Sequence, residues 1–246
     1  MNKIAIIPAR GGSKRIPRKN IKNFLGKPII AYSIEAAIQS GLFDEVMVST
    51  DDNEIADIAK QYGATIPFMR SEKTSNDFAT TFEVIDEVVT NYKLLDRNFD
   101  YICCIYACAP FVTCKKLLDS FQLLQQNEFD SVFPIQSFGF PIQRALRFDN
   151  NKISFFYPEY SSSRSQDLEK SYHDAGQFYW MNTEICLTKK QILTDNTGSI
   201  IISELEGQDI DNEIDWKLAE LKYELVQSTQ YTKFYIRNVF FSTYPI

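Results

Sequence analysis

Glycines and basic side chains gather just after the first apolar run of the sequence. Residues 3–8 form a short apolar run that predicts a buried strand, and a basic loop, residues 9–20, follows it directly. Open α/β sheets bind ligands beyond the carboxyl ends of their strands, which is where this loop would lie. Gly11 and Gly12 can adopt backbone angles closed to other residues and turn their amides towards phosphate oxygens. The basic residues of the loop are Arg10, Lys14, Arg15, Arg18 and Lys19.

The basic loop predicts a phosphate-binding site. It matches neither the G-x-x-x-x-G-K-[ST] loop nor the G-x-G-x-x-G dinucleotide fingerprint. When a triphosphate is attacked at its α-phosphorus, negative charge develops on the non-bridging oxygens and on the departing diphosphate, and fixed cations lower that barrier. A solvated basic turn is the alternative interpretation, and two glycines, five basic residues and a strand exit together favour the phosphate site.

Two aspartates separated by one residue, Asp209 and Asp211, can hold a cation. Alternate side chains of an extended segment point the same way, so both carboxylates can face one ion. Magnesium prefers hard oxygen ligands and usually takes one or two carboxylates with phosphate oxygens and water. Helix capping is the alternative, because Asp211 is followed by Asn212, Glu213 and Asp215, which suit a first helical turn. A phosphate loop in the same chain makes metal binding the preferred interpretation.

The distribution of charge supports both sites. The chain has 26 basic and 32 acidic residues, a net charge of −6, which does not indicate a nucleic-acid surface. Residues 1–27 contain eight basic residues and no acid, whereas residues 201–216 contain six acids and no base. A cationic patch and an anionic patch on one domain agree with a phosphate site and a cation site.

The sequence is typical of a soluble cytoplasmic protein. It contains no apolar run of about 18 residues, the length that a membrane span requires. Its N-terminus lacks the apolar stretch and cleavage site of a signal peptide. Its five cysteines lack paired zinc-ligand spacing, so we interpret them as small buried side chains kept reduced.

Short apolar runs alternate with helical periodicity through the first half of the chain. Strands are predicted at residues 3–8, 45–50, 64–69, 100–106 and 130–136, and helices at 28–40, 53–62, 80–95 and 113–127. Asp52 and Thr113 are predicted to cap the second and fourth of these helices. Strands that alternate with helices imply right-handed crossovers, and therefore an α/β fold with a mainly parallel sheet between helices on both faces.

The alternation stops after residue 137. The remaining predicted segments are an inserted arm at residues 138–175, parallel core strands near 176–182 and 199–203, and a helix beginning near residue 213. We therefore expect one domain over residues 1–225. The aromatic tail, residues 226–246, receives no functional interpretation.

Several stretches resemble the CMP-sugar synthetases, the family of the CMP-sialic acid synthetases. The stretches are residues 6–22, 25–64, 77–81 and 209–215, with Arg70, and the resemblance covers about residues 3–220. The first stretch is the most specific because its length and order both match. The resemblance implies a Rossmann-like three-layer α/β/α nucleotidyltransferase fold with a dimerisation arm. It also implies a magnesium-dependent reaction in which CTP and an acidic keto-sugar give a CMP-sugar and diphosphate.

The same resemblance implies roles for individual residues. The nucleotide-binding residues would be Ala9, Arg10, Gly11, Gly12, Ser13, Lys19, Asn20, Arg70, Asp77, Thr80, Thr81 and Tyr106. The catalytic residues would be Arg10, Lys14, Lys19 and Asp211, and the magnesium ligands would be Asp209 and Asp211. No side chain is an obvious dedicated general base.

Two stretches depart from the sialic acid enzymes and resemble the branch of the family that uses pseudaminic acid. Tyr106 stands where a glutamine is usual, and residues 172–180 read YHDAGQFYW in place of an asparagine-glycine-alanine stretch. The implied sugar-binding residues are Arg164, Gln166, His173, Asp174 and Gln177. An arginine can take a sugar carboxylate with two parallel hydrogen bonds, although without the resemblance Arg164 would be an exposed loop charge. In the family the arm reaches a partner subunit, which implies a homodimer.

Three other functions remain open at this point. One is the same chemistry on legionaminic, sialic or octulosonic acid. Another is a glycosyltransferase with a related sheet, but such enzymes use a D-x-D after a middle strand and lack the basic loop. A third is a nucleotide-binding regulatory protein without catalysis, which would have lost Lys19, Asp209 or Asp211, and all three are present.

Overall fold

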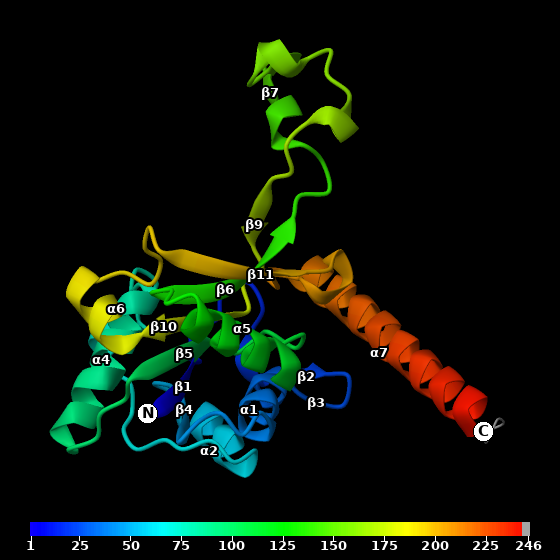
Figure 1. Ribbon diagram of the computed structural model, residues 1–246. Coiled ribbons are helices and arrows are strands. Elements are labelled where there is room, and N and C mark those ends of the chain that lie inside the picture. Colours follow the sequence, from blue (N-terminus) through cyan, green and yellow to red (C-terminus); the bar gives the residue numbers. More distant parts are fainter. Residues whose placement is uncertain (243–246) are drawn as a thin grey trace.

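A seven-stranded sheet forms the centre of the molecule (Figure 1). A computed structural model describes the backbone of residues 1–242 and the side chains of residues 1–229. The strand order is β11 (Thr197–Ile202), β6 (Ser131–Ser137), β10 (Phe178–Asn182), β5 (Tyr101–Ile105), β1 (Lys3–Pro8) and β4 (Glu45–Ser49), with β9 (Tyr172–Asp174) paired to β6. The pairs β1–β4, β1–β5 and β6–β11 are parallel, whereas β10 is antiparallel to both neighbours. The predicted mainly parallel sheet is confirmed.

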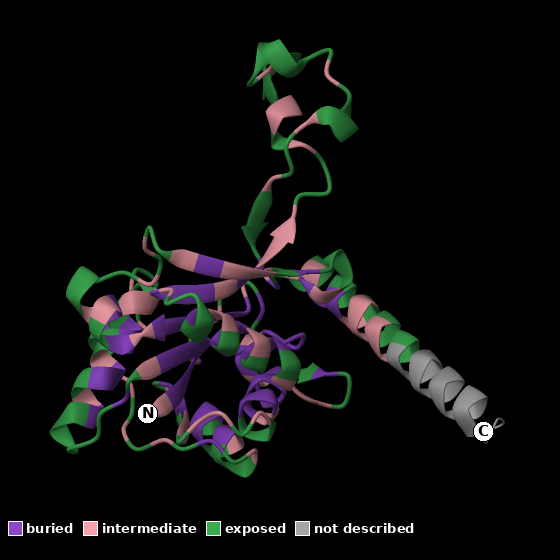
Figure 2. Ribbon diagram, in the orientation of Figure 1, coloured by how far each residue is buried: buried purple, intermediate pink, exposed green. Residues whose placement is uncertain are grey.

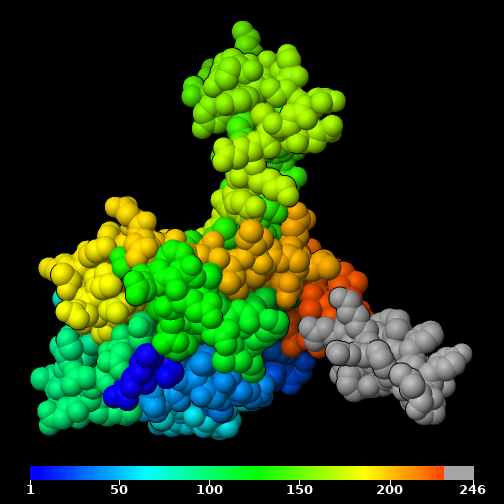
Figure 3. Space-filling model, in the orientation of Figure 1, coloured from blue at the N-terminus to red at the C-terminus, as the bar shows by residue number. Residues whose placement is uncertain are grey.

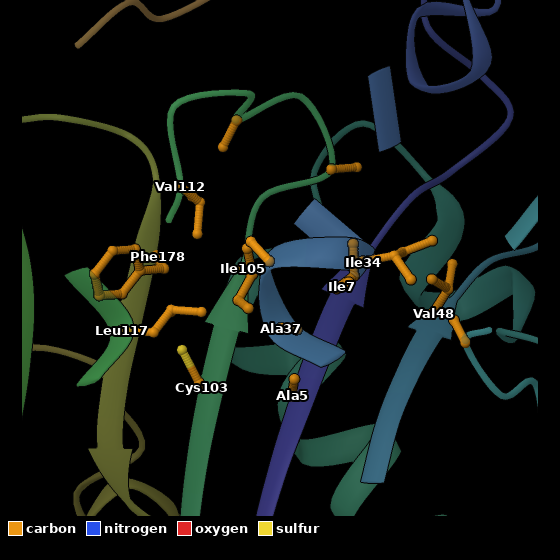
Figure 4. Close-up of a cluster of buried hydrophobic side chains, with 14 of the residues drawn as sticks. Ala5, Ile7, Ile34, Ala37, Val48, Cys103, Ile105, Val112, Leu117 and Phe178 are labelled. Atoms are coloured by element: carbon orange, nitrogen blue, oxygen red, sulfur yellow. The ribbon is translucent and has the colours of Figure 1, made fainter. Parts of the chain in front are cut away.

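Helices cover both faces of this sheet. Helices α1 (Ile29–Gln39), α2 (Asn53–Gln61) and α5 (Cys114–Gln126) pack on one face, and α4 (Thr81–Leu94) and α6 (Thr183–Lys189) pack on the other. Strand β1 shows why, because Ala5 and Ile7 point to the first group while Ile4 and Ile6 point to the second. Figure 4 shows the first of these two cores between the strands and α1. The predicted three-layer α/β/α arrangement is therefore confirmed.

Side chains cap three of the predicted helices, and the two caps that were predicted, Asp52 and Thr113, are confirmed. Asp52 accepts a hydrogen bond from an amide in the first turn of α2, and Thr113 does the same for α5. Thr80 forms a reciprocal capping box with Glu83 at the start of α4. Each cap pairs a backbone N–H that the helix itself leaves without a partner. The three helices therefore begin within a residue or so of their predicted starts.

Two predicted strands need correction. At residues 64–69 only Thr65 pairs, in an isolated bridge with Met47, because Pro67 lacks the N–H that a strand ladder needs. Strand β10 was expected in the parallel core but runs antiparallel, since the alternation of side chains is the same in either direction. Smaller elements that the sequence did not predict include α6, α3 (Glu72–Ser75) and the hairpin strands β2 (Asn23–Phe24) and β3 (Lys27–Pro28).

The residues between β6 and β9 project from the body as an arm (Figures 1 and 3). The arm contains an antiparallel hairpin of β7 (Leu146–Asp149) and β8 (Lys152–Phe155). Its turn residues, Asn150 and Asn151, have φ values of 49° and 61°, in the left-handed region that asparagine tolerates. Large apolar side chains of the hairpin, including Phe148 and Ile153, are exposed (Figure 2). The arm therefore buries little apolar surface against its own chain.

Helix α7 (Glu213–Ser242) leaves the body and extends away from it (Figure 1). Its first turns pack Trp216 and Ala219 against the body, and the predicted helix start near residue 213 is confirmed. Residues 226–242 of the tail continue this helix, and the last four residues of the tail lie outside the described residues. Within the part of the chain that the structure describes, no helix is long and apolar enough to span a membrane.

Candidate functional site

A cavity of about 500 Å³ opens at the carboxyl ends of β1 and β5. Of the residues predicted from sequence, those that line it are Arg10, Ser13, Lys14, Lys19, Asn20, Arg70, Asp77, Tyr106, Asp209 and Asp211. It is also lined by Pro8, Arg15, Ile16, Asn76, Ala79, Ala107, Cys108, Gly176 and Ile210, which the prediction did not include. These segments meet because parallel strands end at the same edge of the sheet.

Acidic residues that follow β4 hold the basic loop in place. The amide of Gly11 donates to Asp51 Oδ1 at 2.9 Å. The guanidinium of Arg18 pairs with the Asp52 carboxylate, the same group that caps α2. This contact lowers the pKa of Asp52, chiefly through its hydrogen bond with Arg18. The loop is therefore fixed to a helix end before any ligand is present.

The structure corrects the role expected for the two glycines. Neither Gly11 nor Gly12 has a positive φ. A Cβ on Gly11 would lie 2.6 Å from Asp52 Oδ2, whereas a Cβ on Gly12 would have nothing within 4 Å. Ala9 is fully buried, and neither it nor the two glycines line the cavity. Gly11 is thus required for close packing against Asp52 rather than for an unusual backbone angle.

We predict that Gly11→Ala destabilises the protein and that Gly12→Ala does not. The added methyl group at residue 11 would displace Asp52, which caps α2 and pairs with Arg18, so the free energy of unfolding should fall by about 1–3 kcal/mol. Urea unfolding of both variants measures this difference. Gly12→Ala is the matched control and should stay within about 0.5 kcal/mol of the parent. Equal losses in both variants would contradict the steric explanation.

Asp77 connects two cations of the basic loop. Its Oδ1 lies 2.5 Å from Arg10 Nη1, and its Oδ2 pairs with Lys14 Nζ. The hydrogen bonds with Lys14 and then Arg10 hold the pKa of Asp77 below its usual range. Asp77 follows α3 in a loop. Asn76 forms the turn of this loop, because its Oδ1 accepts hydrogen bonds from the amides of Phe78 and Ala79. One carboxylate, that of Asp77, therefore pairs with both of the basic residues that were predicted to meet a triphosphate.

Four further predicted nucleotide-binding residues are Arg70, Thr80, Thr81 and Tyr106, and two of them line the cavity. Arg70 is partly buried, and this burial lowers the pKa of its guanidinium. Tyr106 lines the cavity, and its hydroxyl lies 3.5 Å from Thr81 Oγ1. Thr80 caps α4, and neither it nor Thr81 is a lining residue. Arg70 and Tyr106 thus form the inner wall, with the two threonines supporting it.

The aspartate pair faces the cavity. Asp209 and Asp211 both line it, while Ile210 between them is 2% exposed and packs with Ile16 and Trp216. Burial, followed by the charge of Asp211, raises the pKa of Asp209. Two like charges held together in this way favour a bound cation, because the cation offsets both effects.

The helix-capping alternative falls on other residues. Asn212 Oδ1 accepts from the amides of Ile214 and Asp215 at 2.8 and 3.1 Å. Asp215 Oδ2 in turn accepts from the amides of Asp211 and Asn212 at 2.9 and 3.0 Å. These two side chains cap α7 between them. The carboxylates of Asp209 and Asp211 are therefore left to the cavity.

Two basic residues join the loop to the aspartate pair. Lys19 Nζ donates to the carbonyl of Ile210 at 2.7 Å, between the two carboxylates. Arg15 Nη2 lies 2.7 Å from Asp211 Oδ1. Arg15 was not among the predicted site residues, and only its position in the basic loop pointed to it. The cationic and anionic patches of the sequence therefore face each other across one cavity.

A buried lysine supports the segment that leads to the aspartates. Lys116 Nζ donates to the carbonyl of Phe111 at 2.9 Å and lies 3.2 Å from Glu206 Oε1. Gln177, predicted to bind sugar, is 2% exposed and donates to the carbonyl of Glu206 at 2.5 Å. Gln177 lies outside the cavity lining. Both side chains fix residue 206, three positions before Asp209.

We predict that Lys116→Met lowers the free energy of unfolding by about 2 kcal/mol. The change leaves the buried Phe111 carbonyl without a donor and Glu206 without its cation. The expected loss is below that for a fully buried pair because Glu206 keeps about a third of its side chain in solvent. Lys115→Met is the control, since this lysine pairs with Asp119 on the surface and should change stability by less than about 0.5 kcal/mol. Chemical unfolding that ranks the two variants equally would contradict this.

The predicted sugar-binding residues occupy two places. Asp174 lies at the root of the arm, where its Oδ2 accepts from the hydroxyl of Tyr179 at 2.6 Å. His173 is its neighbour, with Nδ1 2.8 Å from the Asp174 carbonyl. Arg164 and Gln166 lie on the arm, where Arg164 pairs with Asp167 at 2.7 Å. None of these four predicted residues lines the cavity in this chain.

Gly176 and Cys108 are two of the lining residues that the prediction missed, and Gly176 had a local signal in the sequence. Gly176 has a φ of 63°, and its amide donates to Asp174 Oδ1 at 2.8 Å. An aspartate two residues before a glycine is typical of such turns, so this position could have been found. Cys108 donates from Sγ to Asn20 Oδ1 at 3.2 Å, and burial raises the pKa of its thiol to about 12. This thiol is therefore a protonated donor rather than a nucleophile.

Comparisons with known proteins agree with this chemistry. A family model described as "Cytidylyltransferase" matches residues 4–203. The chain is 41% identical to the pseudaminic acid cytidylyltransferase of Campylobacter jejuni over 92% of this chain and 97% of that protein. It is 34% identical to the CMP-N,N'-diacetyllegionaminic acid synthase of Legionella pneumophila over 92% of this chain and 98% of that protein.

The fold also has relatives among solved structures. A CMP:2-keto-3-deoxy-manno-octonic acid synthetase complexed with CTP superposes with a TM-score of 0.67, covering 93% of this chain and 100% of that one. The two sequences are 16% identical, so this likeness speaks for the fold alone.

Proposed function

The chain belongs to the cytidylyltransferase family, and from this premise we propose that it transfers the cytidylyl group of CTP to pseudaminic acid. The observation that carries the choice of sugar is the likeness to the pseudaminic acid enzyme over nearly the whole of both chains. The cavity supports the choice of reaction, because basic side chains on one wall face two carboxylates on the other.

The reaction needs no covalent enzyme intermediate. The anomeric hydroxyl oxygen of the sugar forms a bond to the α-phosphorus of CTP, the bond from that phosphorus to the bridging oxygen breaks, and the hydroxyl proton is released. Arg10, Lys14 and Lys19 supply fixed positive charge where negative charge grows on the non-bridging oxygens and the departing diphosphate. Since the site also holds both reactants in one cavity, orientation adds to this stabilisation.

We propose that Asp209 and Asp211 hold a magnesium ion. The fit rests on their shared orientation into the cavity and on the raised pKa of Asp209, which a bound cation would lower. When bound, such an ion supplies positive charge to an α-phosphate oxygen and acidifies a coordinated hydroxyl. Lys19 holds the backbone between the two carboxylates, and Asn212 with Asp215 fixes the backbone that follows.

Sugar selection is assigned to the inner wall and the root of the arm. Tyr106 packs against Tyr179 with ring centroids 5.3 Å apart, and Tyr179 donates to Asp174. These residues link the cavity to the segment that distinguishes the branches of the family. Legionaminic, sialic and octulosonic acids remain the alternatives, and the family match disfavours a glycosyltransferase.

We propose a homodimer formed through the arm. The hairpin exposes Phe148 and Ile153, which a partner subunit would bury. In such a dimer Arg164 and Gln166 would approach the partner's cavity, where the guanidinium could take the sugar carboxylate. A cytoplasmic location is also proposed, because CTP is consumed and all five cysteines are free thiols.

Diphosphate release with CTP and magnesium tests the proposed function. Pseudaminic, legionaminic and sialic acids are compared side by side at equal concentrations. We expect release with pseudaminic acid and at most about 1% of that rate with the others, a difference of about 2.7 kcal/mol in transition-state binding. Release with another sugar would keep the reaction and change the substrate. No release with any of them would refute the assignment of the cavity.

A further inference from the structure

Helix α7 has an apolar stripe that nothing in the described chain covers. The body-facing side of the helix carries Trp216 and Ala219, which are 3% and 0% exposed. The opposite side carries Ile214, Leu218, Leu221 and Leu225, with exposures between 42% and 78%. A helix with one buried face normally places polar residues opposite it. Four large apolar side chains in that position indicate a second contact surface.

The spacing of the stripe is that of a coiled coil. Its members are separated by four, three and four residues, which is the heptad pattern of positions that meet at a helix–helix seam. Helix α7 extends away from the body beyond Leu225, so a second helix can lie along this side (Figure 1). The stripe therefore fits another amphipathic helix rather than a flat surface.

We infer that this stripe pairs with the same stripe of a second copy of the chain, with the two helices antiparallel. The charges beside the stripe decide the partner and the direction. Lys217 and Glu224 flank it on one side, are exposed, and have no ion-pair partner among the described side chains. In an antiparallel pair, residues on this flank of the stripe lie opposite the same flank of the second helix. Lys217 of each copy therefore lies opposite Glu224 of the other copy, which gives two ion pairs related by the two-fold axis.

A parallel pair lacks this complementarity. Parallel helices would bring Lys217 opposite the second copy's Lys222, a repulsive contact. The residues on the other side of the stripe are already engaged within their own chain. Asp215 accepts from the amides before α7, and Lys222 donates to the carbonyl of Gly207 at 2.9 Å. Lys217 and Glu224 are therefore the residues that select the antiparallel pairing over the parallel one.

The same charges disfavour a lipid surface as the occupant. Helices that lie on membranes carry an excess of Lys and Arg beside the apolar face. Here the four flanking residues, Asp215, Lys217, Lys222 and Glu224, have no net charge. This balance suits a self-complementary protein contact.

The first test is the mass of the full-length protein in solution, measured by light scattering during size exclusion. In a Phe148→Asp background, which removes the proposed arm contact, we expect Leu218→Asp together with Leu221→Asp to halve the molar mass, because two buried apolar contacts become buried charges. Leu94→Asp, on an exposed leucine at the end of α4, is the control and should leave the mass unchanged. Circular dichroism shows whether the variants are folded. A folded stripe variant with the parent mass would overturn the inference.

A charge exchange tests the antiparallel register. Lys217→Glu and Glu224→Lys should each weaken association about 10-fold, because two attractive contacts become repulsive. The double variant should recover the parent association, and an equimolar mixture of the two single variants should associate as well as the parent does. Failure of both rescues would exclude this pairing. Replacing Phe148 on the arm separates this inference from the proposed arm dimer. If the Phe148 variant loses mass and the stripe variant does not, the stripe contact is refuted and the arm dimer is not.

Discussion

Replacing Asp211 with alanine is expected to lower the turnover number by about 10³-fold, which corresponds to about 4 kcal/mol of transition-state stabilisation. The change removes one of the two carboxylates that face the cavity. The fold should survive, because Asn212 and Asp215 cap α7 without the Asp211 side chain. Diphosphate release across a range of magnesium concentrations, together with urea unfolding, measures both effects. Parent activity at added magnesium would remove the metal role.

The contact between Asp211 and Arg15 offers a different explanation for a loss of turnover in the Asp211 variant, and a second variant separates this explanation from the metal role. Arg15→Met removes the 2.7 Å pair but leaves both carboxylates in the cavity. If Asp211 acts on a cation, Arg15→Met keeps the parent's magnesium requirement, and Asp211→Asn behaves like the alanine variant. If Asp211 only positions Arg15, the asparagine variant recovers activity and Arg15→Met does not. Glu204→Gln, an exposed acid outside the cavity lining, serves as the control.

Replacing Lys19 with alanine is expected to lower the turnover number by about 10²- to 10³-fold, with a smaller rise in the Michaelis constant for CTP. The lysine charge lies at the junction of the basic loop and the aspartate pair, where it donates to the Ile210 carbonyl. Its attraction for phosphate oxygens is stronger in the transition state, because more negative charge has developed there. Steady-state kinetics at saturating sugar and magnesium separate the two constants.

Lys22→Ala is the matched control for Lys19. Lys22 pairs with Glu213 outside the cavity lining, so its loss should leave turnover within about twofold. If Lys19→Ala changed only the Michaelis constant, Lys19 would be a ground-state binding residue. If its effect disappeared at high magnesium, its main role would be to hold the backbone of Ile210.

The fold was accessible from sequence because its signals are local. Alternation in β1 separates Ala5 and Ile7 from Ile4 and Ile6, and this is the pattern of a strand buried on both faces. Asp52 and Thr113 mark helix starts because their side chains bond amides three residues away. The direction of β10 was not accessible, because it depends on which strands lie beside it and not on its own residues.

Site residues could be predicted from the sequence only where the residue type and its spacing by themselves indicate the chemistry. Lys19 and Asp209 stood out through charge and spacing, and both line the cavity. The pairing of Arg15 with Asp211 joins residues 196 positions apart, so no local pattern reveals it. The requirement for Gly11 comes from Asp52, which lies on another loop. In the proposed dimer Arg164 would meet a sugar bound to the partner subunit, and no local pattern in a sequence indicates a contact between two chains.

In the proposed reaction, the contacts of Asp77 with Arg10 and Lys14 would make nucleotide binding a counter-ion exchange. An incoming triphosphate would have to displace the one carboxylate that pairs with both cations, so part of their attraction for the nucleotide would offset the loss of that pairing. When diphosphate departs, the carboxylate can pair with both cations again, so neither cation is left without a partner. Asp77 would thus weaken nucleotide binding and speed product release. The turnover number can therefore rise even though Asp77 competes with the nucleotide for the same two cations.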